Sequence, residues 1–359
     1  MTSTAVNLAI TSAGLLTSVG YDARTASAAI RARITRPKPI EECKVLDLGS
    51  GEVRPLMGHP ISPITNGFVG PARWLQMAPP AFANLVRLGS LPSPEDAAFW
   101  GRCALMIVLP DLQGERFQFN ERSSPERISE TFMMPLRQHL PRALPAEHVL
   151  LQPLDRVALP HIIRQSGELM RMMGVDRIAI LVVDSLVDPF ALNWLGENGR
   201  LKSDLNPTGL MPGECAAALL LEAERPGIHD QRPTWARVVV ATVGQDAASG
   251  DQDAPPRGRA LAEALSPALE GGVVDLFSDL NGEPWRAREY GTALVHLGGP
   301  NLHLHHCASE VGDVGAPSSV LNTILATWSL LRRSARGARV AVAISSDNGG
   351  VGSLAIERA

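Results

Sequence analysis

The residues best suited to chemistry gather near the end of the chain, in the segment Asn-Leu-His-Leu-His-His-Cys at positions 301–307. If this segment is a β-strand, His303 and His305 share one face, because side chains alternate between the two faces of a strand. Together with Glu310 or Asp313 they could hold a metal ion. Histidines two residues apart are common by chance, so we predict that the protein has no metal and no other cofactor.

Cys307 follows these histidines and could act as a nucleophile. A reactive thiol needs a nearby positive charge or a helix N-terminus to lower its pKa. The sequence predicts no helix start at this position, so we expect an inert thiol. Cys215 lies in an apolar segment typical of a buried strand and is expected in the core.

Two polar segments elsewhere could line a binding cleft. One begins at Asn281 and continues through Glu283 to Glu289, and we expect a solvated turn whose salt bridges add little stability. The other is a glycine-rich run that includes Gly349 and Gly350, which could approach a ligand or only permit a tight turn between buried strands. Because it is not G-x-G-x-x-G in a strand–turn–helix, it predicts no dinucleotide site.

Length and composition narrow the class of protein. The chain has 359 residues and 45% of them are apolar, so it can bury a sizeable core. Its net charge is −4 and it has no basic block, which argues against a nucleic-acid partner. We find no run of about 18 apolar residues and no basic segment before an apolar one at the start, so we expect neither a membrane span nor a signal peptide. Four scattered cysteines without C-x-x-C spacing favour the reducing cytoplasm.

Helices alternate with buried strands along the chain, which indicates an α/β fold. The order helix, glycine, buried strand occurs at residues 162–183 and again at 320–344, which is a weak internal duplication. Residues 292–297 are predicted as a further strand. The proline-rich stretch 36–71 is expected to be loop or sheet edge, because proline lacks a backbone donor. Residues 226–233 are expected to be a linker, and the Gly/Asp/Pro-rich residues 247–258 are expected to be a loop.

Four segments resemble motifs of the β-ketoacyl synthases. Residues 6–20 (VNLAITSAGLLTSVG) resemble the family's start, which reads like V-A-I-T-G-x-G-x-x-T-x-x-G. Residues 210–222 (LMPGECAAALLLE) resemble its G-E-G-A-A-x-x-x-L-E strand, and residues 312–318 (GDVGAPS) resemble its G-H-x-x-G-A-A-G helix start. Residues 347–353 (DNGGVGS) resemble its C-terminal F-G-F-G-G-x-N turn. The four segments follow the family's order, so the chain is similar to β-ketoacyl-ACP synthases of the thiolase superfamily.

The resemblance implies a thiolase-like fold, in which two duplicated halves form five layers in the order αβαβα. We place the N-terminal half at 1–225, with an inserted proline-rich region at about 36–145, and the C-terminal half at 226–359. The resemblance also implies a dimer built by edge pairing of central strands.

The family's chemistry uses a cysteine at a helix N-terminus and two histidines, and this chain has none of the three. The matching positions are Arg156 for the cysteine, Asn281 for the first histidine and Asp313 for the second. Claisen condensation needs a thiolate to carry the acyl group and donors to stabilise the enolate. An asparagine could donate one hydrogen bond, whereas an ionised aspartate only accepts.

The degenerate positions predict a non-catalytic role as a partner subunit, scaffold or adaptor. The chain would form a homodimer, or a heterodimer with an active synthase or another protein. The alternative is an acyltransferase of the 3-oxoacyl-ACP synthase type with a non-standard active site, which would take an acyl or acyl-carrier ligand in a residual cleft. The candidate residues for that cleft are Asn281, His303, His305, Cys307, Glu310, Asp313, Gly349 and Gly350.

Overall fold

The computed structural model describes residues 2–117, 124–223, 232–246 and 258–359. The strands are β1 (Thr2–Leu16), β2 (Lys38–Leu46), β3 (Val53–Gly58), β4 (Cys103–Leu109), β5 (Val149–Pro153), β6 (Arg177–Ser185), β7 (Glu214–Ala223), β8 (Ala236–Gln245), β9 (Asp275–Ser278), β10 (His303–His306), β11 (Arg339–Ser345) and β12 (Gly350–Arg358). The helices are α1 (Ala23–Arg31), α2 (Pro71–Leu88), α3 (Ala97–Trp100), α4 (Pro125–Ile128), α5 (Met134–Arg137), α6 (Ala158–Met173), α7 (Pro189–Glu197), α8 (Arg259–Leu269), α9 (Pro284–His296), α10 (Ala308–Val311) and α11 (Ser318–Leu331).

Ten strands form one continuous sheet whose two halves have the same design. The order is β10-β9-β11-β12-β8-β1-β7-β6-β4-β5, with β8 and β1 antiparallel at the centre. Outward from β1, β7 and β6 alternate in direction, and β4 and β5 run parallel to β6. Outward from β8, the strands β12, β11, β9 and β10 repeat that pattern of directions. The internal duplication predicted from the sequence is therefore present in the sheet.

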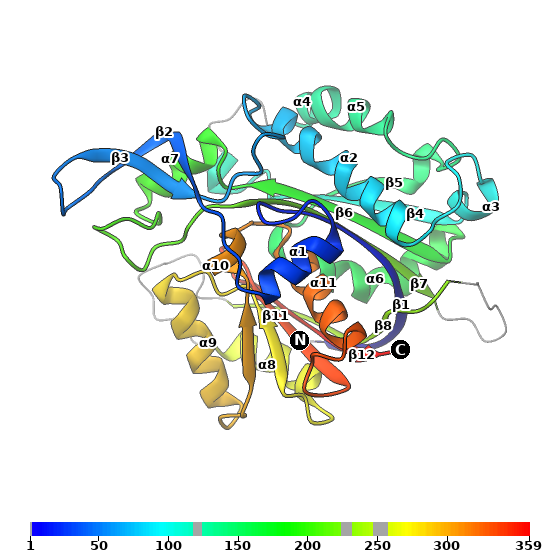
Figure 1. Ribbon diagram of the computed structural model, residues 1–359. Helices are drawn as coiled ribbons and strands as arrows, with labels where there is room; N and C mark the ends of the chain where they lie inside the picture. Colours follow the sequence, from blue (N-terminus) through cyan, green and yellow to red (C-terminus); the bar gives the residue numbers. More distant parts are fainter. Residues whose placement is uncertain (1, 118–123, 224–231, 247–257) are drawn as a thin grey trace.

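The helices complete five layers (Figure 1). Helix α2 covers the outer face of the β1–β7–β6 half, and α8 covers the outer face of the β8–β12–β11 half. Helices α6 and α11 lie between the two halves of the sheet and contact both, and α1 packs against β1 and α11 in the same layer. One apolar cluster fills this middle layer, and two further clusters lie under α2 and under α8. The predicted five-layer α/β architecture is confirmed.

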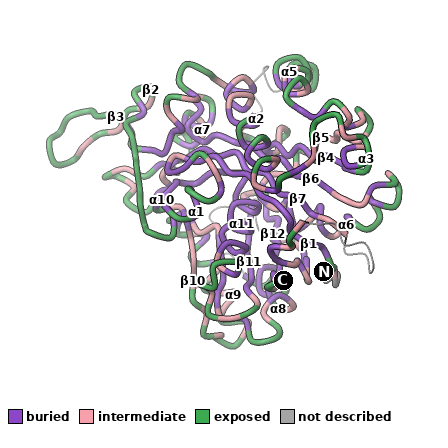
Figure 2. Tube along the Cα trace, turned by 45° about the vertical axis from the view of Figure 1, so that its right-hand side comes forward, coloured by how far each residue is buried: buried purple, intermediate pink, exposed green. Residues whose placement is uncertain are grey.

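Strands at the centre of a half are buried on both faces, which is why they are continuous apolar runs in the sequence (Figure 2). In β4, Met106 and Val108 point into the middle layer, whereas Leu105 and Ile107 point toward α2. Helix α6 ends at Gly174, whose φ of 66° is the left-handed conformation that glycine adopts without strain. The predicted helix, glycine and strand therefore occur as α6, Gly174 and β6.

Some sequence-based expectations about elements were wrong. Residues 292–297 are not a strand but the end of α9, where Val295 is 76% exposed, so the short apolar run does not mark burial. The strands of this region are β9 and β10, each of only four residues. The expectation of loop or sheet edge for the proline-rich stretch 36–71 agrees with the structure, because β2 and β3 form a separate two-stranded sheet in which both strands are edges.

Two of the domain limits proposed from the sequence can be compared with the elements of the structure. The region 36–145, expected as an insertion, includes α2 and β4, which are integral parts of the N-terminal layers. The division at 225/226 lies outside the described residues, as do most of the expected linker 226–233 and loop 247–258. Among the helices that the structure describes, none is long and apolar enough to span a membrane.

The close approach of α2 to β1 gives a test of the packing. A Cβ at Gly14 would lie 2.0 Å from the carbonyl oxygen of Ala81 in α2. Because the helix would have to move, we expect Gly14→Ala to lower the free energy of unfolding by about 1–3 kcal/mol. The matched control is Gly167→Ala in α6, where an added Cβ meets no atom within 4 Å and stability should rise slightly. Denaturant unfolding compares the two, and equal stabilities would contradict the close packing of α2.

Candidate functional site

Arg156 is a buried arginine at the start of a helix in the middle layer. It lies in the 3₁₀ turn Asp155–Val157, which leads directly into α6, and only 3% of the residue is exposed. Its guanidinium group pairs with the carboxylate of Asp313 at 2.8 Å and donates to the Ser318 hydroxyl at 3.3 Å. This position before α6 is where the resemblance assigned the missing cysteine.

Asn281 joins the same group of side chains. Its amide nitrogen donates to Asp313 at 2.6 Å and to Glu283 at 2.8 Å. Arg156 and Asp313 are 157 residues apart in the chain, yet the fold brings them into contact. Asp313 connects the other two residues, because its carboxylate accepts from both Arg156 and Asn281. The three positions that the resemblance assigned as degenerate therefore lie together.

These contacts are part of a larger closed circuit, which we call the charge ring. Its members, in order of contact, are Arg156, Asp313, Asn281, Glu283, Arg200, Asp347, Arg286 and Asp279. The strongest link is the bidentate pair between Arg200 and Glu283, at 2.7 and 2.8 Å. Asp347 is the most exposed member, because a third of its side chain faces a cavity. The ring holds three guanidinium groups and four carboxylates.

The sheet explains why these residues meet. Strands β9 and β11 are parallel neighbours, so their carboxyl ends lie at the same edge. Asp279 directly follows β9 and Asp347 follows β11, which places both carboxylates at that edge. Arg286, in the first turn of α9, reaches both of them, at 3.2 Å and 2.6 Å.

The pKa shifts follow from burial and pairing. Burial by itself would raise the pKa of Asp313, but Arg156, Arg286 and the hydrogen bond from Asn281 together lower it. The pKa of Asp347 is also lowered, because Arg200 and Arg286 outweigh the effect of burial. Burial raises the pKa of Asp279 more than Arg286 and Arg156 lower it. Asp313 and Asp347 are therefore held as carboxylates that accept hydrogen bonds and do not donate them.

The expectation of a solvated turn at 281–289 was wrong. Asn281, Glu283, Arg286 and Glu289 are all buried, and Arg286 is only 1% exposed. Their polar types resembled a surface turn in the sequence, but each charge of Glu283 and Arg286 finds its partner in a distant segment. Only the folded chain supplies those partners.

A cavity of about 390 Å³ opens beside the charge ring. Arg156, Arg200 and Asp347 contribute to its wall, and a further ion pair between Arg116 and Asp184 at 2.9 Å lies on the same wall. Its apolar side is formed by Phe117, Leu186, Trp194, Leu195 and Leu210. Among the described residues that line it there is no cysteine, serine, threonine, tyrosine or histidine.

Three of the four cysteines are buried, Cys43 is half-buried, and the pKa of every thiol is raised. Cys307 caps the N-terminus of α10, so the expectation that it lies away from a helix start was wrong. Burial nevertheless raises the pKa of Cys307 to about 12, and that of Cys103 to about 12. Burial also raises the pKa values of Cys215 and Cys43. No cysteine is therefore poised as a thiolate at neutral pH.

The residues proposed for a residual cleft do not line one cavity. Asn281 and Asp313 belong to the charge ring, and Cys307 lies near them around a small void. Glu310 is buried and pairs instead with Arg33 at 3.1 Å. Gly349 and Gly350 form the tight turn between β11 and β12, where Gly349 has a φ of 82°.

His303 and His305 share a face of β10, as the strand hypothesis predicted, but their carboxylate neighbour differs from the expected one. It is Asp275 of β9, which lies 2.8 Å from Nε2 of His305, and not Glu310 or Asp313. The donor atoms of the two histidines and Asp275 lie within 4.8 Å of one another and could hold one metal ion. The guanidinium of Arg336, 3.8 Å from Asp275, opposes a cation there. The absence of a metal and of other cofactors stays a prediction.

Sequence reasoning did not find Arg200, Arg286, Asp279 or Asp347 as site residues. Asp347 lies inside the glycine-rich segment that resembles the C-terminal motif, and Asp279 lies two residues before Asn281, so both are close to a sequence signal. Arg200 follows α7 in a segment that matches no motif. Its place in the charge ring depends on contacts with Glu283 and Asp347, which only the tertiary fold brings close.

The charge ring predicts a large stability effect. We expect Asp313→Asn to lower the free energy of unfolding by about 3–5 kcal/mol, because it leaves Arg156 buried without its counter-charge. The double variant Arg156→Met with Asp313→Asn should recover much of this loss. The control is Glu130→Gln, whose pair with Arg127 is 3.8 Å long and exposed, and should cost under about 0.5 kcal/mol. Chemical unfolding measures all three, and equal effects of Asp313→Asn and Glu130→Gln would contradict the ring.

Three solved structures place the fold among known ones. The AntDE:AntF complex, described as a type II PKS acyl-carrier protein with its ketosynthase bound to the hexaketide, matches with a TM-score of 0.75 and 12% identity over 99% of this chain and 100% of that one. The ishigamide ketosynthase/chain length factor matches with a TM-score of 0.73 and 17% identity, over 99% and 100% of the two chains. The ketosynthase from module 6 of the bacillaene synthase of Bacillus subtilis 168 matches with a TM-score of 0.71 and 12% identity, over 98% of this chain and 72% of that one.

No protein-family model matches the sequence, and no curated protein does. The likeness is therefore one of structure at low identity, and it agrees with the sheet order and the five layers. The chain has the thiolase-like fold of the ketosynthases.

Proposed function

We propose that this protein is a non-catalytic, ketosynthase-like subunit that pairs with an active ketosynthase. The observation that carries the proposal is the charge ring. It contains Arg156, Asn281 and Asp313, the positions at which the resemblance would require a cysteine and two histidines. Their side chains are committed to one another by short contacts.

The side chains at these three positions do not provide the nucleophile and the hydrogen-bond donors that condensation needs. A guanidinium group has no lone pair to attack a thioester, and Arg156 is further held positive because the surrounding carboxylates raise its pKa against the effect of burial. Asp313, an ionised acceptor, would repel an enolate rather than stabilise it. The alternative, an acyltransferase with a non-standard site, needs a nucleophile beside a base. The described wall of the neighbouring cavity offers neither a hydroxyl or thiol nor a histidine.

The sheet offers a surface for a partner. Strand β5 is at the end of the N-terminal half of the sheet, so among the described residues no strand pairs with one row of its backbone N–H and C=O groups. Val149, Leu150 and Leu151 in this strand are only partly buried. An edge strand with apolar side chains is a template for pairing with another chain. Two of the similar structures are a ketosynthase/chain length factor and a ketosynthase in complex with an acyl-carrier protein, which supports a role within such an assembly.

The proposal predicts that an active ketosynthase is encoded beside this chain and forms a one-to-one complex with it, measured by light scattering after size-exclusion chromatography. Leu150→Lys should weaken this complex at least tenfold, about 1.4 kcal/mol, because it places a charge on the β5 edge. Val295→Lys, on the exposed face of α9, is the matched control and should leave the complex unchanged. Thermal melts establish that both variants are folded. A chain that ignores the ketosynthase, or a complex insensitive to Leu150→Lys, would contradict the proposal.

A further inference from the structure

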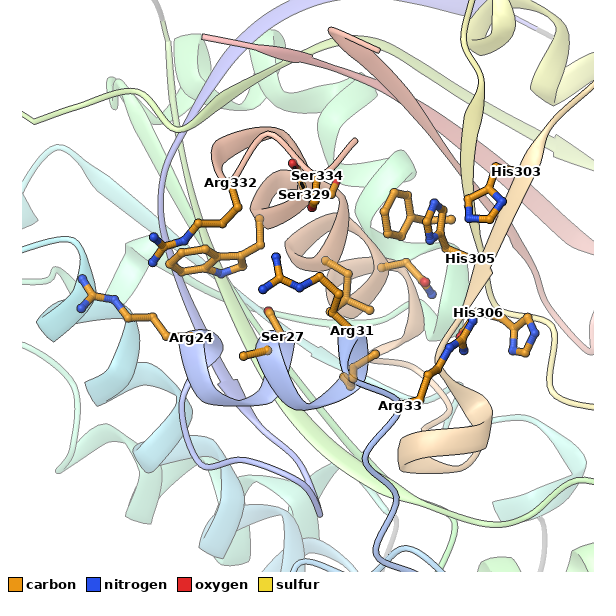
Figure 3. Close-up of a pocket in the computed structure, with 16 residues that line it drawn as sticks. Arg24, Ser27, Arg31, Arg33, His303, His305, His306, Ser329, Arg332 and Ser334 are labelled. Atoms are coloured by element: carbon orange, nitrogen blue, oxygen red, sulfur yellow. Dashed lines mark hydrogen bonds between the residues drawn. The ribbon is translucent and has the colours of Figure 1, made fainter. Parts of the chain in front are cut away.

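A strongly cationic cavity lies between α1, α11 and β10, and it is separate from the cavity beside the charge ring. Its volume is about 440 Å³, within the range of small-molecule sites. Figure 3 shows basic side chains from all three elements around it. These are Arg24, Arg31, Arg33, Arg332, His303, His305 and His306. The described residues that line it include no carboxylate, in a chain whose net charge is −4.

Most of this positive charge is not neutralised. Arg33 pairs with Glu310 and His305 with Asp275, and both carboxylates are buried behind the wall. In the part of the chain that the structure describes, no ion pair involves Arg24, Arg31 or Arg332. An anion would therefore meet three unpaired guanidinium groups.

Helix dipoles do not account for the pattern. Arg31 in the last turn of α1 and Arg332 just after α11 lie at helix C-termini, where a positive charge is favourable. Arg24, however, lies in the first turn of α1, where the same effect disfavours a cation. The histidines come from a strand, which has little dipole of its own. What these residues share is the cavity that they face.

Buried donors on the cavity wall lack partners. The indole nitrogen of Trp328 and the hydroxyl of Ser27 have no hydrogen-bond partner among the described residues, and each residue is only 8% exposed. These two donor atoms and the amide oxygen of Asn322 are shielded from solvent, so they lie behind the cavity wall, and the arginines supply the polar groups that a ligand can reach. The two donors come from α11 and α1, on either side of the cavity.

The cavity also has an apolar wall. The Arg332 guanidinium lies 5.4 Å from the centre of the Trp328 ring, and Ile30 and Leu325 add aliphatic surface. Guanidinium groups bind phosphate through paired N–H bonds, and an indole face binds a flat or apolar body. We propose that this cavity binds a small organic phosphate, with its phosphate against the arginines and its body against Trp328. This inference does not depend on the proposed function.

Calorimetric titration of the full chain, after treatment with EDTA, tests the proposal. The probes are ADP, glycerol 3-phosphate, inorganic phosphate and uncharged adenosine. ADP should bind more tightly than inorganic phosphate, and adenosine should bind at least tenfold more weakly than ADP. Arg31→Gln should weaken ADP binding at least tenfold, whereas Arg142→Gln, an exposed arginine outside the cavity, should leave it unchanged.

A second variant guards against an indirect effect. Ser27→Leu keeps every charge but fills the cavity, so it should also weaken ADP binding while a thermal melt shows a folded protein. Binding of neither ADP nor glycerol 3-phosphate would overturn the proposal, as would equal losses in Arg31→Gln and Arg142→Gln. Binding of a polyglutamate peptide without binding of either phosphate ester would assign the surface to an acidic protein and overturn it too. Equal affinities for inorganic phosphate and ADP would overturn the role of Trp328.

Discussion

The pairing of Arg156 with Asp313 is the interaction on which the site depends. A guanidinium group taken out of water costs several kcal/mol unless carboxylates and hydrogen bonds surround it. In this protein, seven further side chains from distant segments of the chain form the charge ring around Arg156 and supply the carboxylates and hydrogen bonds. The same ring occupies the position at which a ketosynthase-like fold would otherwise present a nucleophile. Under the proposed function, the stability of this site and the absence of condensation chemistry both follow from the same arrangement.

The duplicated sheet makes this arrangement possible. The neighbouring parallel strands of each half have their carboxyl ends at the same edge of the sheet. The antiparallel pairing of β1 with β8 joins the two halves. Helix α6, which follows Arg156, packs between them. A partner that pairs with the β5 edge would extend the sheet close to the ring, because Arg156 follows the end of β5 by three residues. The cationic cavity by α1 is a third surface, so the fold has room for a partner and a ligand at once.

The sequence predicted the fold well, because buried parallel strands and a helix ended by Gly174 leave strong local signals. Arg156, Asn281 and Asp313 could be aligned because motifs of recognisable order surround them. Arg200 and Arg286 could not be found, since a buried ion pair and a solvated one use the same residue types. Residues 292–297 were mistaken for a strand because six residues are too few to separate the two periodicities. For Cys307 the expected inert thiol stays a prediction, and the reason for it is different: burial raises its pKa, although the residue caps a helix start.

The most direct test of the central claim is intact-mass spectrometry after incubation with a panel of acyl-CoA and acyl-carrier-protein thioesters. An active ketosynthase, labelled in parallel, shows that the thioesters are competent. The account predicts no acyl mass shift on this chain, because no cysteine is a thiolate and Arg156 cannot attack a carbonyl. A stable acyl adduct mapped to one residue of this chain would contradict the non-catalytic assignment and identify a nucleophile.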